Sequence, residues 1–209
     1  HFPALLPASY CADVHERLKD YDSALDMVDR ALAKRRDSFD LLCRSGDLRI
    51  KQAKRTLAKA DKTGDTRRAS ELERGLLELE VEEFRKRVDQ HPGDAELRLG
   101  LGRRLMRIDQ PDAALAELQK ANGDTRIQRE ALFLMAQCFH KKGFVDLARK
   151  EYERSLEGVH EVDERAKEVL YSLGSIAEAE GNGQEARSLY ARVYEVDIGY
   201  RDVAAKMEQ

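Results

Sequence analysis

The sequence has 209 residues, of which 37% are charged and 42% hydrophobic, with 37 Lys and Arg against 40 Asp and Glu. The net charge of −3 provides no overall field that would attract nucleic acid, and no run of about 18 apolar residues is present that would span a membrane. With only 4 Pro and no Trp, a chain rich in Ala, Glu, Lys, Leu and Arg is expected to be mostly helical.

The first residues form a short apolar segment among prolines. Phe2, Leu5 and Leu6 indicate a linker or the remnant of an earlier repeat. The sequence begins with His1 rather than Met, and we interpret it as a fragment of a longer protein. It has neither the basic start nor the long apolar stretch of a signal peptide, so we expect a cytoplasmic location. A first pair of helices is predicted over residues 5–38.

Residues 39–91 are predicted to form one helical hairpin with longer arms than its neighbours. Apolar or small residues alternate at spacings of four and three, which is typical of helices packed along their length. They are Gly46, Ile50, Ala53, Leu57 and Ala60 on the first arm, and Ala69, Leu72, Leu76 and Leu79 on the second. We expect the tip near Lys62–Thr66 and the end of the second arm at Pro92, which cannot continue a helix.

Basic residues concentrate on this hairpin. The candidates for an anionic partner are Lys54, Arg55, Lys59, Lys62, Arg67 and Arg68. They suggest docking on nucleic acid or on an anionic membrane surface. However, no aromatic residues lie among them to stack on bases, and a hairpin in water carries charge on its outer faces in any case. We therefore favour a solvated surface and keep docking as the alternative function.

Three further pairs of helices are predicted at residues 94–127, 128–161 and 166–199. Each contains an alanine followed four residues later by a larger side chain: Ala114 with Leu118, Ala148 with Tyr152, and Ala186 with Tyr190; Ala24 with Val28 repeats this in the first pair. The small residue allows two antiparallel helices to approach, and the larger one fills the space beneath the next turn. Left-handed turns are expected at Gly143, and at Gly181 and Gly183.

This arrangement resembles the tetratricopeptide repeat, which has an aromatic residue, a Leu-Gly pair and a Tyr on its first helix, and Ala, an aromatic residue and a late Pro on its second. The matching segments are LYSLGSIA with EARSLY at 170–190, RLGLGRRL with AALAEL at 98–118, and LFLMAQCF with LARKEY at 132–152. Arg98, Leu132 and Leu170 replace the opening aromatic, and these three repeats lack the late Pro. The resemblance covers residues 94–209 well and residues 5–38 less closely.

The resemblance implies an all-α, right-handed α-solenoid of helix pairs over residues 1–209, with one elongated hairpin. A capping helix is expected at 200–209, where Tyr200, Val203, Ala204 and Met207 share one face. It also implies a non-catalytic scaffold that binds another protein or a peptide segment in a concave groove lined by the first helices. The residues predicted to line this groove are Leu99, Arg103, Met106, Arg107, Phe133, Gln137, His140, Lys141, Tyr171 and Ser175.

Family members that bind chaperone tails carry a Lys and an Asn one turn apart on the first helix. This sequence has Leu99 with Arg103 at these positions, so we do not predict binding of a chaperone C-terminus. A homodimer, formed through an apolar N-terminal end, remains open. A regulatory or dimerisation region of a longer protein is a further alternative.

The sequence contains few residues arranged for chemistry. None of the five His has another His three or four residues away. The three cysteines, Cys11, Cys43 and Cys138, form no CxxC pair, and we expect them to be buried in helices. No phosphate-binding loop or nucleophile motif is present. We therefore predict no enzymatic activity, no metal, no cofactor and no small-molecule substrate, and we do not expect nucleic acid or a membrane as the main partner.

Overall fold

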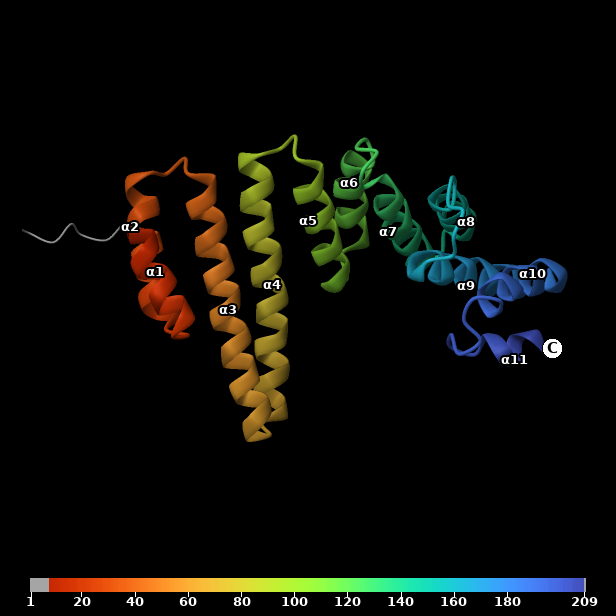
Figure 1. The fold of residues 1–209 in the computed structure, drawn as a ribbon, viewed down its shortest axis with the longest axis horizontal. Helices are drawn as coiled ribbons and strands as arrows, with labels where there is room; N and C mark the ends of the chain where they lie inside the picture. The colour runs from red at the N-terminus through yellow and green to blue at the C-terminus, as the bar shows by residue number, and fades with distance from the viewer. Residues whose placement is uncertain (1–7, 209) are drawn as a thin grey trace, which may run out of the picture. The chain divides into compact units, whose positions relative to one another are not determined.

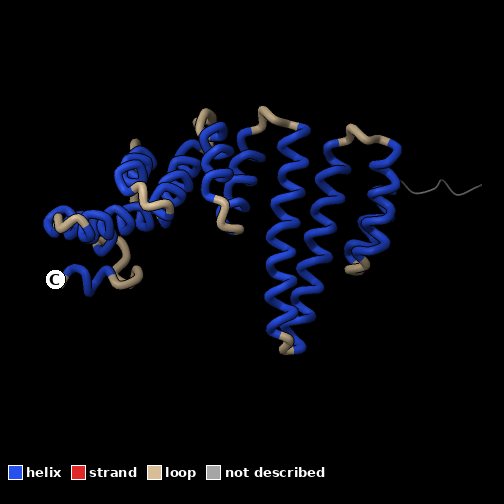
Figure 2. The backbone as a smooth tube through the Cα atoms, turned by 180° about the vertical axis from the view of Figure 1, so that it is seen from behind, coloured by secondary structure: helices blue, strands red, loops and turns tan. Residues whose placement is uncertain are grey.

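The computed structural model describes residues 8–208, with side chains from Ala12 onward. This part of the chain contains eleven α-helices and no strand. The all-α fold predicted from the sequence is confirmed. Phe2, Leu5 and Leu6, and the side chain of Cys11, lie outside the described residues. The chain divides into two compact units, His1–Ile108 (unit 1) and Asp109–Gln209 (unit 2), each of which is described by itself (Figures 1 and 2).

Unit 1 is built from helices that each pack against the next one in the sequence. They are α1 (Ala8–Arg17), α2 (Tyr21–Lys34), α3 (Phe39–Thr63), α4 (Thr66–Gln90) and α5 (Ala95–Arg107). Ala24 and Val28 are almost completely buried in a cluster with Ala12 and Leu48. The predicted close packing at the first alanine is therefore confirmed.

Helices α3 and α4 form the elongated hairpin predicted from the sequence. Each has 25 residues, against 14 in α2 and 13 in α5, which corresponds to about 37 Å against about 20 Å of helix. Figure 2 shows this hairpin extending past the helices on both sides of it within unit 1. The turn lies at Gly64 and Asp65, within the predicted tip, and the predicted seam residues are all buried or half-buried.

Unit 2 contains the remaining six helices. They are α6 (Pro111–Ala121), α7 (Gln128–Lys141), α8 (Val145–Ser155), α9 (Glu164–Ala179), α10 (Gly183–Tyr194) and α11 (Val203–Met207). Helices α7 with α8 and α9 with α10 form the predicted pairs at 128–161 and 166–199. The pair predicted at 94–127 consists of α5 and α6, which belong to different units, so their pairing stays a prediction.

The alternation of small and large residues sets the packing inside unit 2. Ala148 and Ala186 are 0% and 4% exposed, and Tyr152 and Tyr190, four residues later, are each 2% exposed. A Cβ atom added at Gly174 on α9 would lie 2.6 Å from Cε1 of Tyr190 on α10. Since that distance is far below van der Waals contact, the ring of Tyr190 requires a glycine at position 174.

The turns between paired helices follow the sequence prediction with one correction. Gly143 and Gly181 have φ of 78° and 80°, the left-handed conformation that ends α7 and α9. Gly183, however, is the first residue of α10 and not part of the left-handed turn. Asn182 precedes it as the N-cap, accepting a hydrogen bond from the backbone N–H of Glu185, so the helix begins one residue after Asn182.

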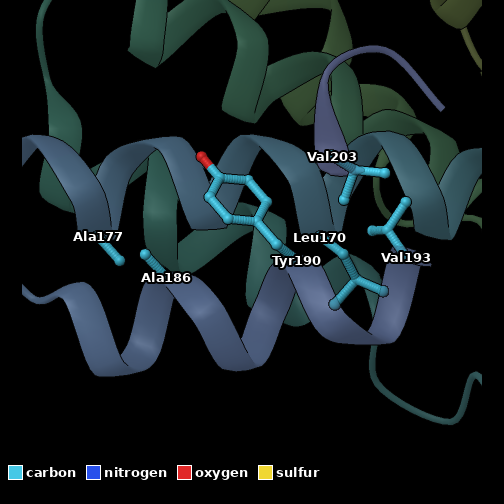
Figure 3. Packing of buried hydrophobic residues seen from close by; sticks show 6 residues of the cluster. All are labelled: Leu170, Ala177, Ala186, Tyr190, Val193 and Val203. Atoms are coloured by element: carbon cyan, nitrogen blue, oxygen red, sulfur yellow. The ribbon is translucent and has the colours of Figure 1, made fainter. Parts of the chain in front are cut away.

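The C-terminal helix covers the end of the last pair, as predicted, although it is shorter than expected. It spans five residues rather than ten, and Tyr200 lies before it. The hydrophobic core at this end comprises Leu170, Ala177, Ala186, Tyr190, Val193 and Val203. Figure 3 shows Ala177 and Ala186 on one side of the Tyr190 ring, with Leu170, Val193 and Val203 on the other. Tyr200 and Met207 pack against this core, which explains how so short a helix is held.

Candidate functional site

The ten predicted groove residues are divided between the two units. Leu99, Arg103, Met106 and Arg107 lie on α5 in unit 1, and the other six lie on α7 and α9 in unit 2. Two of the ten require correction: Leu99 and Phe133 are 4% and 1% exposed, so neither offers surface to a partner.

Phe133 is buried because α7 is enclosed on more than one face. All residues from Ala131 to Ala136 are buried. The helical spacing used to predict the groove residues therefore does not identify a solvent-exposed face in this part of α7. The Phe133 ring lies 6.1 Å from the ring of Tyr152 on α8. The guanidinium of Arg165 on α9 lies 4.1 Å from the Phe133 ring centroid. The residue thus belongs to the packing between consecutive helices.

Gln137, His140 and Lys141, at the end of α7, remain accessible and lie together. With Tyr152 they line a hollow of about 390 Å³. Gln137 donates a hydrogen bond of 3.3 Å to Glu168 on α9, and Nζ of Lys141 lies 2.7 Å from Oδ1 of Asp109. The accessible groups of the hollow are therefore an amide, an imidazole and an ammonium, while Tyr152 is 2% exposed.

Tyr171 and Ser175 on α9 are only partly exposed, because the C-terminal segment of the same chain contacts this face. The Tyr171 hydroxyl donates to Asp202, and the guanidinium of Arg201 lies 4.7 Å from the Tyr171 ring. The hydrogen bond to Asp202, together with burial, raises the pKa of Tyr171 to about 12. The Ser175 hydroxyl lies 3.2 Å from that of Tyr190. The hydroxyl groups of Tyr171 and Ser175 thus already form hydrogen bonds within the protein.

A larger hollow of about 460 Å³ lies beside α11, and three of its polar residues, Glu178, Tyr190 and Lys206, are paired with each other. Lys206 donates to both carboxylate oxygens of Glu178, at 2.7 and 2.8 Å, and the Tyr190 hydroxyl donates to Glu178 at 3.0 Å. The bond from Lys206, and then that from Tyr190, lowers the pKa of Glu178. These bonds connect the capping helix to α9 and α10.

Ion pairs at about the repeat spacing connect the first helices of successive pairs in unit 2, and sequence analysis missed them. Arg129 on α7 donates two hydrogen bonds, of 2.6 and 2.7 Å, to the carboxylate of Asp163, the N-cap of α9. This bidentate contact is the main reason why the pKa of Asp163 is lowered to about 2. Their separation of 34 residues, one repeat length, is the sequence signal that marks such pairs.

The basic residues of the hairpin fall into two groups. Lys59, Lys62, Arg67 and Arg68 lie near or at the exposed tip, where Arg67 pairs with Glu71 on its own helix at 3.2 Å. Nearer the base, Arg55 donates to the backbone oxygen of Lys19. Lys54 is directed to the neighbouring helix α4 instead, where its Nζ lies 3.3 Å from Oε1 of Glu80.

Glu80 is a buried acid that joins the two surfaces predicted separately from the sequence. Its side chain is 5% exposed, and its carboxylate receives Lys54 from α3 and Arg107 from α5, the latter at 2.6 Å. A predicted hairpin residue and a predicted groove residue thus meet at one carboxylate. Periodicity did not reveal this, because Glu80 reads as one more surface charge of a charged helix.

Metal binding and membrane insertion find no support in the described residues. Among residues 12–208, no group of three or more His, Cys, Asp or Glu side chains is placed to hold a metal ion. Over residues 8–208, none of the helices combines the length and the apolar character needed to cross a bilayer. Cys138 is buried as predicted, and burial raises the pKa of its thiol to about 11; Cys43 is half-buried.

Comparisons with known proteins agree with this architecture. MamA has a crystal structure with a TM-score of 0.62 at 20% identity, covering 88% of this chain and 92% of MamA. YrrB, a tetratricopeptide-repeat protein with an unusual peptide-binding site, gives 0.66 at 16% identity, covering 99% and 93%. TTC0263, a tetratricopeptide-repeat protein of Thermus thermophilus, gives 0.53 at 16% identity, covering 96% and 95%.

Identities this low show a shared fold, and the comparison with curated protein sequences gave no match. The sequence model of the tetratricopeptide repeat matches residues 99–159 and, overlapping them, residues 141–200. These segments include the helix pairs in which Ala148 and Ala186 pack against neighbouring helices. Residues 99–200 therefore consist of tetratricopeptide repeats, and the chain has the fold of tetratricopeptide-repeat proteins.

Proposed function

We propose that this protein is a non-catalytic scaffold that holds a segment of a partner protein against the end of α7. The observation that carries the proposal is the convergence of Gln137, His140 and Lys141 around a hollow with Tyr152 in its wall. Gln137 supplies an amide, His140 an imidazole and Lys141 an ammonium, and these groups can form hydrogen bonds with the backbone and polar side chains of a peptide. YrrB, which has the same fold, has a peptide-binding site, and this likeness supports a peptide as the ligand.

The hollow is the part of the predicted groove that best suits a partner. On α9, Tyr171 and Ser175 are already engaged by hydrogen bonds within the protein. On α7, His140 and Lys141 are exposed and keep donors and acceptors directed to solvent. A peptide that contacts His140 replaces water, and at Lys141 it competes only with the exposed ion pair to Asp109, so little free energy is lost on binding.

The alternative, docking through the basic hairpin tip on nucleic acid or a membrane, receives less support. Asp61 to Arg68 are all exposed and contain no aromatic residue, so the tip has no platform on which bases could stack. Its charges are those of a solvated turn.

The test is selection of peptides from a random display library on the full 209-residue chain, followed by titration of the selected peptides by fluorescence anisotropy. His140→Glu/Lys141→Glu is expected to weaken binding about tenfold or more, since it reverses the polar rim of the hollow. Gln119→Glu/Lys150→Glu makes the same change in net charge at exposed positions of unit 2 and should leave affinity within about twofold.

Two results would count against the proposal. One is the failure of the folded chain to enrich any peptide above the library background. The other is equal affinity of the two double variants for the selected peptides, which would place the binding surface elsewhere. Circular dichroism of each variant confirms that the helices are intact.

A further inference from the structure

Three cationic side chains of unit 1 meet at the buried carboxylate of Glu80. Lys54 comes from α3, and Arg104 and Arg107 come from α5. Their nitrogen atoms lie 3.3 Å (Nζ of Lys54), 4.0 Å (Nε of Arg104) and 2.6 Å (Nη1 of Arg107) from the nearest Glu80 oxygen. We name these four residues the Glu80 cluster. With one carboxylate among three cations, it carries an excess of two positive charges.

Two further acids of α3 and α4, Glu83 and Asp47, are paired with other cations. Glu83, one turn further along α4, is itself buried and pairs with Arg49 at 3.4 Å and Lys86 at 2.9 Å. Asp47 on α3 is bound by Arg87 at 2.5 Å. Neither carboxylate is therefore available to offset the excess charge around Glu80.

The positive charges of the cluster are crowded. Burial lowers the pKa of Arg104, and the neighbouring guanidiniums of Arg87, Arg107 and Arg103 lower it further. The Arg104 guanidinium carbon lies 3.4 Å from the centroid of the Phe84 ring, and its Nη1 donates to the backbone oxygen of Gly100. Its buried Nε has no hydrogen-bond partner among the described residues. Contacts with Phe84 and Gly100 thus fix the Arg104 side chain, and its Nε–H group remains without an acceptor in the described part of the chain.

The other two cations of the cluster reach solvent. The side chains of Lys54 and Arg107 are 58% and 55% exposed, although Glu80 beneath them is 5% exposed. A lysine ammonium has three donors and an arginine guanidinium five. Binding Glu80 therefore leaves both groups with donors that face outward.

We propose that the Glu80 cluster binds an acidic segment of a partner protein through the carboxylates of Asp or Glu side chains. Lys54 and Arg107 already hold a carboxylate within the fold, so their spacing suits that group. Phe84 is covered by Arg104 and offers no face for base stacking, which disfavours single-stranded nucleic acid. The proposal concerns unit 1 and does not rest on the hollow of unit 2.

The experiment uses the full chain and two labelled peptide probes of equal length, one alternating Glu with Ser and the other Gln with Ser. Fluorescence anisotropy at low salt should detect binding of the glutamate peptide and none of the glutamine peptide. Lys54→Gln/Arg107→Gln is expected to weaken the glutamate peptide about tenfold, since two charge-assisted contacts are removed. The variant leaves only Arg104 beside the buried Glu80 carboxylate, so circular dichroism first establishes that it is folded under the conditions of the titration.

Lys62→Gln/Arg68→Gln is the matched control, because it removes the same charge from exposed positions of the same hairpin. It should change the affinity by less than about twofold. Equal weakening by the two pairs would overturn the proposal in favour of diffuse attraction to a basic hairpin. Comparable binding of the glutamine peptide, or no binding of the glutamate peptide at low salt, would overturn it as well.

Two further measurements separate the alternatives. A short DNA single strand that binds about tenfold more tightly than the glutamate peptide, and depends on Lys54 and Arg107, would show that the partner class is wrong. The unit 2 variant His140→Glu/Lys141→Glu should bind the glutamate peptide as the unsubstituted protein does. The experiments can therefore show separately whether the proposal for the Glu80 cluster or the proposal for the α7 hollow is wrong.

Discussion

The two units fill their interiors in different ways. In unit 2 the largest fully buried side chains are Tyr190, packed against Gly174 of α9, and Phe133, packed between Tyr152 of α8 and Arg165 of α9. In the described part of unit 1 they are Leu48 and Leu105, and Glu80 and Glu83 are buried as well, at 3% and 2% exposure. Where the repeat pattern is regular, complementary sizes hold the helices together. Unit 2 also buries charges, since Lys167 and Glu151 are 7% and 8% exposed, but in unit 1 the two buried glutamates each receive at least two cations from the side chains around the lengthened hairpin.

The largest expected effect tests the size complementarity of unit 2. Tyr190→Ala should lower the free energy of unfolding by about 3–5 kcal/mol, because it leaves a cavity opposite Gly174. Urea denaturation followed by circular dichroism measures the change. Tyr194→Ala, four residues later on the same helix and 36% exposed, is the control and should cost less than about 1 kcal/mol. Similar losses of unfolding free energy for the two variants would show that the packing of Tyr190 against Gly174 does not contribute more to stability than an exposed tyrosine does.

The second prediction tests the buried charges of unit 1. Glu83→Gln should lower the free energy of unfolding by about 2 kcal/mol, since Arg49 and Lys86 lose their shared buried partner. This is below the loss for a fully buried pair because both cations are more than a third exposed. Glu82→Gln also removes a partner of Lys86, but from a side chain that is 64% exposed, and should cost about 0.5 kcal/mol or less. A neutral result for Glu83→Gln would mean that this buried ion pair does not contribute to the stability of unit 1.

The third prediction concerns acid and unit 2. The pKa of Asp163 is lowered to about 2 from 3.8, so its pairing with Arg129 is fully stabilising only above the unfolded value. That contribution disappears as the pH falls from about 4 through 2. Between pH 5 and pH 3 the unsubstituted protein should lose about 0.5 kcal/mol more than Asp163→Asn, after discounting for the exposure of both side chains. Asparagine keeps the N-cap, so equal losses in urea titrations would argue against the ion pair.

The smallest expected effect concerns the hairpin tip. Arg67 is 92% exposed and pairs with Glu71 four residues on, so Arg67→Gln should change the free energy of unfolding by about 0.3 kcal/mol. Urea denaturation of this variant beside Glu83→Gln compares an exposed charge with a buried one in the same hairpin. A loss approaching that of Glu83→Gln would contradict the division into a solvated tip and a paired base.

Helix positions, the long hairpin and the alanine contacts could be predicted from the sequence, because periodicity and residue size determine them locally. The interactions that connect one helix to the next were harder to predict. Phe133 has the spacing of an exposed residue, yet it is buried because α8 and α9 both contact it. Gly183 looked like a second turn glycine, but Asn182 supplies the cap that starts α10 before it.

The candidate site was predicted only in part, for a related reason. His140 and Lys141 lie three and four residues after Gln137 on the same helix, so all three share one face and their proximity follows from helix geometry. The meeting of Lys54 with Arg107 requires Glu80, which lies on a third helix and is one of 40 acidic residues. No single-helix pattern distinguishes a buried carboxylate from the solvated ones around it. That information is contained in the packing of three helices.

Within each unit, the closest packing is between helices that are consecutive in the sequence. A newly synthesised helix therefore finds its main packing surface on the helix made just before it. Few loops must close over long stretches of chain, which favours rapid folding. Each helix of a unit can be added during translation without waiting for a distant segment. Fraying, by the same reasoning, is expected to start at α11, a helix of five residues whose main packing partner is α10.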